Sequence, residues 1–157
     1  MIVLAIMGIL LGISVPNIKT YTLRTEKVVL KSILRVLMDG QDVYFMENNK
    51  FYPDNDIIFI KEGQAREIPE LGYTFADGHK YRYLIFGANR ELELTQPIMT
   101  SSMKKKPEKP KKAKYYYYTI VVYTDKDFNN NGRNDIFVAR TYIRNGQVLD
   151  NRKIYQY

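Results

Sequence analysis

The sequence predicts an α+β fold in which one long N-terminal helix packs on an antiparallel β-sheet. Residues 1–18 form an uncharged and mostly apolar run, and apolar residues continue at helical spacing through residues 19–50. Residues 51–157 instead contain short runs rich in Tyr, Ile, Val and Thr, separated by Gly and Asn turns, which is typical of strands. We therefore expect three segments: a hydrophobic helix half, an amphipathic helix half and a β-sheet domain with a single core.

The hydrophobic half of the helix, Met1–Ile18, has almost the length of a transmembrane span. Eighteen helical residues extend about 27 Å, slightly less than the ~30 Å hydrocarbon core of a bilayer. Gly8 and Gly12 share one helix face and permit close approach of another helix, and Pro16 has no amide hydrogen for the carbonyl of Gly12. We expect helix–helix assembly through Gly8, Gly12 and Pro16, and the easiest bending or unwinding between Gly8 and Pro16. A buried core helix and a simple membrane anchor are the alternatives.

The second half of the helix is amphipathic. Apolar residues recur near helical spacing on one side, and basic residues recur at steps of three and four on another. The apolar side consists of Leu30, Ile33, Leu34, Leu37 and Tyr44, and the basic side of Arg24, Lys27, Lys31 and Arg35. Asp39-Gly40 is expected to kink or weaken the helix, and Asn48-Asn49 followed by Tyr52-Pro53 is expected to end it.

The region after the helix predicts a mixed connection and then strands. Asp54–Leu71 is expected to run between the helix and the sheet. Ala76-Asp77-Gly78 is a turn signal between Tyr73–Phe75 and Tyr81–Phe86, so these two runs are expected to form a hairpin. Glu91–Thr95 is a candidate third strand.

Basic charge is concentrated in one polar segment, residues 97–114, which is expected to be an extended loop. Within it, Lys104–Lys114 carries a local charge of +6, whereas the net charge of the whole chain is +7. A basic face that covers the whole domain is therefore not indicated. The loop is expected either to bind an anion such as DNA, surface polysaccharide or lipid headgroups, or only to solubilise the surface. The candidate anion-binding residues are Lys104, Lys105, Lys106, Lys109, Lys111, Lys112 and Lys114.

The last third of the chain predicts an antiparallel meander. Tyr115–Thr124 is strongly β-prone, and two of its four leading tyrosines should point to each face of the sheet. Packing in the sheet is the default role of these rings, with sugar stacking or electron hopping as the alternatives. Ile136–Ile143 and Gln147–Tyr157 predict two more strands, joined by the two-residue turn Asn145-Gly146.

A polar loop between these strands predicts a calcium site. Counted from Asp127, oxygen-bearing side chains fall at positions one, three, five and nine, glycine falls at position six, and a backbone carbonyl is available at position seven. An EF-hand-type loop wraps Ca²⁺ in this order, although Val138 replaces the glutamate at position twelve. The alternative is an Asn131-Gly132 hairpin turn with ordinary loop polarity. The candidate ligands are Asp125, Asp127, Asn129, Asn131, Arg133 (through its carbonyl) and Asp135.

The composition argues against an enzyme. Cysteine is absent, and His79 is the single histidine, so the chain offers neither a thiol nucleophile nor a pair of histidines for zinc. No Gly-x-Ser-x-Gly motif is present. We expect His79, beside the turn at residues 76–78, to have a surface or packing role rather than a catalytic one.

An apolar helix that continues through a proline into an amphipathic helix resembles the type IV pilins and the type II secretion pseudopilins. Their N-terminus typically reads Phe-Thr-Leu-Ile-Glu-Leu, followed by a run similar to MIVLAIMGILLGISVPNI with a glycine and a proline placed like Gly8 and Pro16. The sequence NKFYP at Asn49–Pro53 is also similar to what often follows the long helix in these proteins. The resemblance is close over the first two dozen residues and one of architecture beyond them.

The resemblance implies a structural subunit of a type IV pilus or a pseudopilus. Such a subunit is held in the bacterial cytoplasmic (inner) membrane by its N-terminal helix and then polymerises, with the hydrophobic helices bundled in the core of a filament in the periplasm or at the cell surface. The implied partners are other pilin subunits, a prepilin peptidase, and an assembly ATPase that acts through a membrane platform protein. Calcium is bound near the C-terminal end of some members, which agrees with the predicted loop.

The sequence departs from the family at its start. Met1 lies roughly six residues inside the usual mature N-terminus, so the basic leader, the N-methylated phenylalanine and the helix glutamate are not in the sequence. Six more helical residues would lengthen the uncharged run to about 36 Å, enough to cross a bilayer. We expect a mis-assigned start or a shortened chain.

Two alternatives to a filament subunit remain at this stage. One is a minor pilin that binds DNA, another anion or a surface through Lys104–Lys114. The other is a membrane-anchored domain that never assembles.

Overall fold

The computed structural model describes residues 2–93, 112–144 and 147–157, and their side chains except at residues 2, 4–6, 8–17, 19, 91–93, 112–113 and 147–151. It contains one long helix, α1 (Ile2–Asn48), and an antiparallel five-stranded sheet in the order β1-β4-β5-β6-β7. These strands are β1 (Ile57–Ile60), β4 (Arg82–Glu93), β5 (Lys112–Tyr123), β6 (Ile136–Arg144) and β7 (Gln147–Gln156). A short antiparallel pair, β2 (Arg66–Ile68) and β3 (Tyr73–Phe75), stands apart from the sheet. The predicted α+β arrangement of helix and antiparallel sheet is confirmed.

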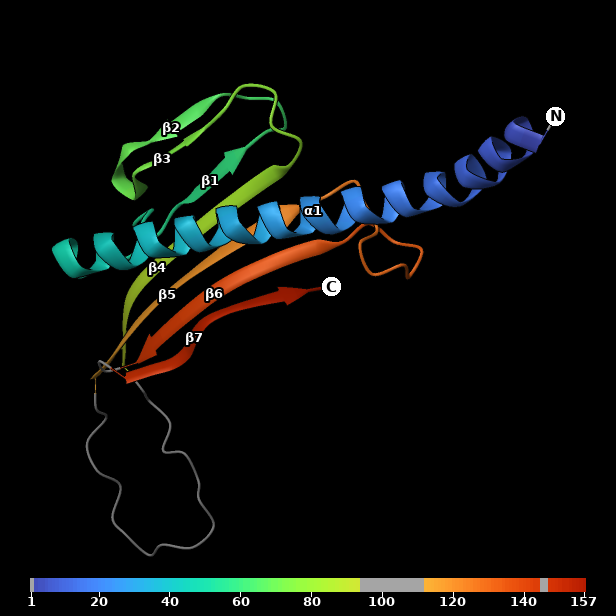
Figure 1. Ribbon diagram of the computed structural model, residues 1–157. Helices are drawn as coiled ribbons and strands as arrows, with labels where there is room; N and C mark the ends of the chain where they lie inside the picture. Colours follow the sequence, from blue (N-terminus) through green and yellow to red (C-terminus); the bar gives the residue numbers. More distant parts are fainter. Residues whose placement is uncertain (1, 94–111, 145–146) are drawn as a thin grey trace, which may run out of the picture.

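The C-terminal half of α1 crosses one face of the sheet, while its N-terminal half extends beyond the sheet (Figure 1). The helix contributes Leu30, Leu34, Leu37 and Met38 to the core, where each is fully or almost fully buried. Ile33 and Tyr44 pack at the margin of the same core, so the predicted apolar side of the helix is confirmed. The sheet face toward the helix supplies Tyr83, Ile85, Tyr118, Ile120, Val122, Phe137 and Ala139.

Helical backbone continues without a break through Gly8, Pro16 and Gly40, and the kink or weakening expected at Asp39-Gly40 stays a prediction. The glycine serves a close contact. A Cβ atom at Gly40 would overlap the backbone carbonyl of Leu71, which lies at the end of the 3₁₀ turn η1 (Pro69–Leu71). Glycine therefore allows η1 to pack directly on the helix.

Side chains from α1 also fix the segment that follows it. Gln41 is fully buried; its amide nitrogen donates to the carbonyl of Tyr52, and its oxygen accepts from the N–H of Tyr52 at 3.0 Å. Asn89 of β4 bonds both backbone groups of Phe51, at 2.8 and 2.9 Å. A buried polar side chain that satisfies two backbone groups holds a loop in one position, because losing either bond leaves buried groups unpaired.

The hairpin expected between Tyr73–Phe75 and Tyr81–Phe86 is wrong. Gly72 adopts a left-handed conformation with φ 61° at the end of η1, and the chain reverses there, so β3 pairs with β2. The connection Asp54–Leu71 consequently contains β1, β2 and η1. Residues 91–93, expected in a separate third strand, are the end of β4, which pairs with β5 along its full length.

The strands of the C-terminal third lie close to their predicted positions. Tyr116 and Tyr118 of β5 point toward α1, and Tyr115 and Tyr117 point away, so the predicted division of the four tyrosines is confirmed. Strands β6 and β7 pair as expected, and the turn at residues 145–146 lies outside the described residues. Lys112 and Lys114 belong to β5, which begins inside the predicted loop, whereas residues 94–111 lie outside the described residues.

Gly40→Ala tests the contact with Leu71. Glycine-to-alanine changes in a helix interior normally stabilise it by up to about 1 kcal/mol, but here the new methyl group meets backbone that cannot move without displacing η1. We expect the free energy of unfolding, measured by chemical denaturation, to fall by about 1–3 kcal/mol. Ser32→Ala, at an exposed position of the same helix, should leave it almost unchanged. Stabilisation by Gly40→Ala would contradict this packing.

Candidate functional site

The loop between β5 and β6, residues 124–135, is organised around the buried carboxylate of Asp135. One of its oxygens accepts from the amide N–H groups of Phe128 and Asn129 and from the side chain of Gln156, and the other accepts from Asn129 Nδ2 at 2.6 Å. Charge-assisted bonds of this kind are stronger than neutral ones. Asp135 thus ties the loop to β7.

Asp127 organises the outer half of the same loop. Its carboxylate accepts from the N–H groups of Asn131 at 3.1 Å and Gly132 at 2.6 Å. Desolvation acts to raise the pKa of Asp127, but the surrounding amide N–H groups outweigh it and lower the pKa below its usual value. Asn129 and Asn131 accept from amides two residues further on, at 3.1 and 2.9 Å, so each turn of the loop is held by a side-chain oxygen.

These bonds bear directly on the predicted calcium ligands. Asp127, Asn129, Asn131 and Asp135 are brought together in one loop, while Asp125 is exposed beside it. All four oxygen-bearing side chains accept bonds from the loop itself, and among the described residues no group of three or more acidic or histidine side chains is placed to hold a metal ion. The calcium site at Asp125, Asp127, Asn129, Asn131, Arg133 and Asp135 stays a prediction.

The loop lies against α1 where the helix leaves the sheet. Glu26 of the helix accepts from Lys126 of the loop at 2.7 Å and from Lys80 at 3.0 Å. A hollow of about 460 Å³ between the two elements is lined by Thr20, Leu23, Arg24, Lys27, Asp127, Phe128 and Asn130. The ammonium groups of Lys126 and Lys80 lower the pKa of Glu26 below its usual value. The loop therefore supports the helix at the edge of the sheet.

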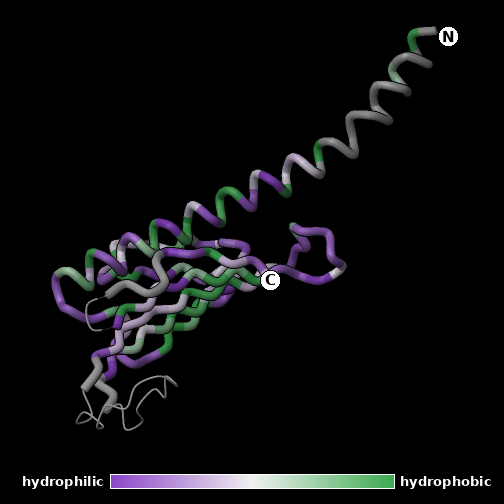
Figure 2. The backbone as a smooth tube through the Cα atoms, turned by 90° about the horizontal axis from the view of Figure 1, so that it is seen from below, coloured by the Kyte–Doolittle hydropathy of each residue, from purple (hydrophilic) through white to green (hydrophobic). Residues whose placement is uncertain are grey.

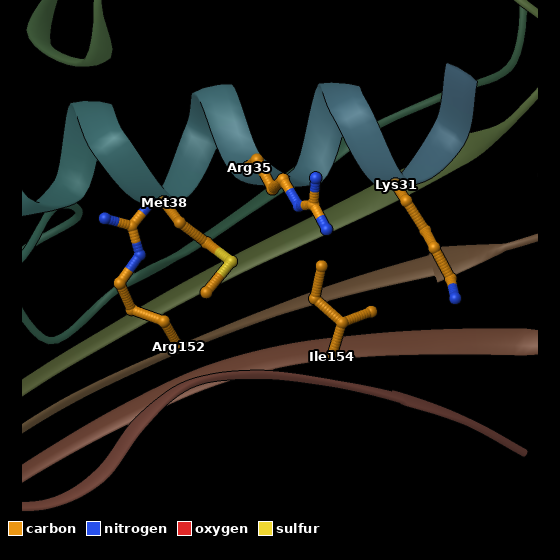
Figure 3. Close-up of a pocket in the computed structure, with 5 residues that line it drawn as sticks. All are labelled: Lys31, Arg35, Met38, Arg152 and Ile154. Atoms are coloured by element: carbon orange, nitrogen blue, oxygen red, sulfur yellow. The ribbon is translucent and has the colours of Figure 1, made fainter. Parts of the chain in front are cut away.

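A second hollow of about 460 Å³ lies between α1 and β7 and is lined mainly by cations (Figure 3). Lys31, Arg35 and Met38 reach it from the helix, and Arg152 and Ile154 reach it from the strand. Arg152 is engaged by the carboxylates of Asp39 and Asp42, and burial raises the pKa of Asp42 despite that guanidinium. The sequence offered no sign of this hollow, because Arg152 is remote in the chain from Lys31 and Arg35.

The predicted assembly residues Gly8, Gly12 and Pro16 lie in the part of α1 that extends beyond the sheet. Among residues whose side chains are described in this part, Val3, Met7, Ile18 and Tyr21 are exposed. Within the described residues, no helical stretch is long and apolar enough to span a membrane.

The candidate anion-binding lysines lie partly outside the described residues. Of the anion-binding candidates, Lys104, Lys105, Lys106, Lys109 and Lys111 lie outside the described residues, while Lys114 lines a hollow beside Asn48–Lys50 on the helix side.

His79 packs between the rings of Phe75 and Tyr83, each 5.6 Å away, and its Nε2 lies 3.0 Å from the carbonyl of Gln64. His79 therefore has packing contacts, and the expectation that it has no catalytic role stays a prediction.

No known protein family matches this chain, and neither a curated protein nor a solved structure shows detectable similarity to it.

The ion pairs of Glu26 predict a loss of stability in acid. Because its pKa is lowered in the folded state, Glu26 contributes stability above its unfolded pKa of about 4.5 and loses it as the pH falls through the lower folded value. The contribution at neutral pH should be below about 1 kcal/mol, since the lysines are partly solvated. Thermal melting between neutral pH and pH 3 should show a smaller acid-induced loss in Glu26→Gln than in the wild type. The matched control is Glu62→Gln, at an exposed carboxyl, and equal losses in all three proteins would contradict the role of Glu26.

The calcium prediction has a separate test. Calcium bound only to the folded loop raises the melting temperature by mass action, so the wild type should melt higher with calcium than with a chelator. Asp127→Ala should remove this difference, because Asp127 is the first oxygen ligand of the predicted order. Identical melting of the wild type under both conditions would contradict the predicted calcium site.

Proposed function

We propose that the chain is a structural subunit of a filament of the type IV pilus or pseudopilus kind, which polymerises through its N-terminal helix. The observation that carries the proposal is the half of α1 that stands clear of the sheet (Figure 2). At 1.5 Å per residue, the 47 residues of α1 extend about 70 Å, and the sheet covers only the C-terminal part. A helix that projects in this way needs cover from lipid or from other helices.

Exposed apolar side chains support this interpretation. Relative exposure is 67% at Val3, 64% at Ile18 and 75% at Tyr21, and large apolar side chains gathered on an exposed surface usually mark a contact with a protein or a membrane. Val29, Val36 and Val43 are also exposed and follow one another at steps of seven residues, along one side of the helix. These three valines form one exposed apolar row along the helix, which another apolar surface could cover.

The proposed cycle uses the same helix twice. The uncharged run from Met1 to Ile18 would lie first in the cytoplasmic membrane and then among the helices of neighbouring subunits. By resemblance, the partners are copies of this chain or related pilins, a prepilin peptidase, an assembly ATPase and a membrane platform protein. The filament would lie in the periplasm or at the cell surface.

A charge in the projecting helix tests the proposal. Ile18→Asp should abolish the filaments that are sheared from cells carrying the gene and sedimented, because an aspartate cannot be buried among apolar helices without a partner. The melting temperature should not fall, because Ile18 is exposed in the subunit. Normal filaments with this variant would contradict assembly through the helix.

The matched control is Ile57→Asp, the same change in the edge strand β1. Ile57 is 55% exposed. Filaments should persist in this variant. If the two variants lose filaments equally, the loss does not depend on the helix. If the wild-type chain stays in the membrane and no filament contains it, the membrane-anchored alternative replaces the filament proposal.

A further inference from the structure

The sheet face turned away from α1 is rich in aromatic rings and arginines. Side chains alternate along a strand, so the residues between the core positions of β4, β5 and β6 all point to this face. No described helix or strand lies over it (Figures 1 and 2). Its residues, which we call the tyrosine–arginine face, are Arg82, Leu84, Phe86, Tyr115, Tyr117, Thr119, Val121, Tyr123, Ile136, Val138, Arg140, Tyr142 and Arg144.

Four rings form a continuous cluster across three strands of this face. Tyr115 and Tyr142 are stacked, with centroids 6.0 Å apart and planes 28° apart. Tyr117 lies 6.3 Å from Tyr142 and 5.6 Å from Phe86. Each ring is half-buried by its neighbours and partly open to solvent. The core does not need these rings, because it lies on the other side of the sheet.

Guanidinium groups border the rings. Arg144 lies 5.5 Å from the ring of Tyr115, and Arg82 lies 5.7 Å from the ring of Tyr123. These contacts are within cation–π range. Across from β6, strand β7 places Lys153 opposite Arg140 and Asp150 opposite Tyr142, so this face carries both signs of charge, with cations in the majority.

Rings beside arginines suit one class of ligand in particular. Aromatic side chains stack on unpaired bases of any sequence, and arginines beside them attract the phosphates between the bases. A duplex hides its bases within its own stack, so an exposed flat sheet favours single strands.

We propose that the tyrosine–arginine face binds single-stranded nucleic acid, with bases stacked on Tyr115, Tyr117 and Tyr142 and phosphates near Arg144 and Arg82. A protein partner fits less well, because most of the charged residues on this face are cations. An anionic polysaccharide would use the arginines but has no planar bases for the rings. The inference goes beyond the filament proposal and does not depend on it.

The test uses the full chain in detergent and a fluorescently labelled oligothymidine, with binding followed by anisotropy. We expect saturable binding that weakens steeply with salt, and weaker binding of a duplex and of heparin. Tyr115→Leu with Tyr142→Leu should lower the affinity about tenfold or more, because stacking is lost while apolar bulk remains. Tyr115→Phe with Tyr142→Phe keeps both rings and should bind like the wild type. Arg144→Gln should weaken binding and flatten its salt dependence.

A matched charge control separates this face from the hollow between α1 and β7. Lys31→Gln with Arg35→Gln removes two cations from the helix side and should leave the affinity unchanged. A loss in this control as large as in Arg144→Gln would overturn the proposal. So would heparin binding as tight as oligothymidine with no effect of the leucine pair, which would indicate charge attraction alone.

If the variant with Tyr115→Leu and Tyr142→Leu misfolds, a second measurement on the wild type tests the proposal. The chain has no tryptophan, so its emission comes from tyrosine, and stacking of bases on Tyr115, Tyr117 and Tyr142 should quench it in the wild type. Oligothymidine that binds without quenching, or that does not bind at all, would overturn the proposal.

Discussion

The mismatch in length between α1 and the sheet is the constraint on which the rest of the structure depends. A helix of 47 residues extends about 70 Å, whereas the longest strands, of 12 residues, extend about 40 Å. The sheet can therefore bury only the part of the helix around Leu30–Met38, and the N-terminal half extends past it. Among the described residues, no other helix or strand covers this half of α1.

The point where the helix leaves the sheet is consequently the point that needs the most support. Strand β5 ends there and β6 begins there, and the loop at residues 124–135 joins the two strands. Asp135 fixes this loop from within by accepting from its amides, and Lys126 then presents its ammonium group to Glu26 of the helix. The buried carboxylate of Asp135 fixes the loop, and the ion pair between Lys126 and Glu26 joins the loop to the helix. Lys80 reaches the same glutamate from the start of β4.

Local patterns in the sequence predicted what depends on local geometry. The spacing of Leu30, Leu34 and Leu37 identified the buried side of the helix, and the run of tyrosines identified a strand with two faces. The predictions failed where distant backbone decides the outcome. In the sequence Gly40 is only a poor helix former, whereas in the structure its missing side chain makes room for the backbone of Leu71. Strand β4 is longer than predicted, because Gly87 leaves room for the carbonyl of Pro53 and Asn89 bonds Phe51, and both partners lie more than thirty residues earlier in the chain. The same limit applies to the candidate site, since alternating oxygen side chains suit a metal ion and a set of amides equally well. Period-two spacing of Arg140, Tyr142 and Arg144 was the available sign of the tyrosine–arginine face, but only strand pairing brings these residues beside Tyr115 and Tyr117.

The two proposed activities use opposite sides of the molecule. Alternation along β4, β5 and β6 sends one set of side chains to the core beneath α1 and the other set to the tyrosine–arginine face, so the sheet itself separates the two surfaces. Helix packing in a filament would occupy the exposed side of α1, around Val29, Val36 and Val43, and would leave the far face of the sheet uncovered. Repetition along a filament would then place many copies of that face in a row. Because a single strand can contact several copies at once, weak binding by each subunit would become strong binding by the assembly.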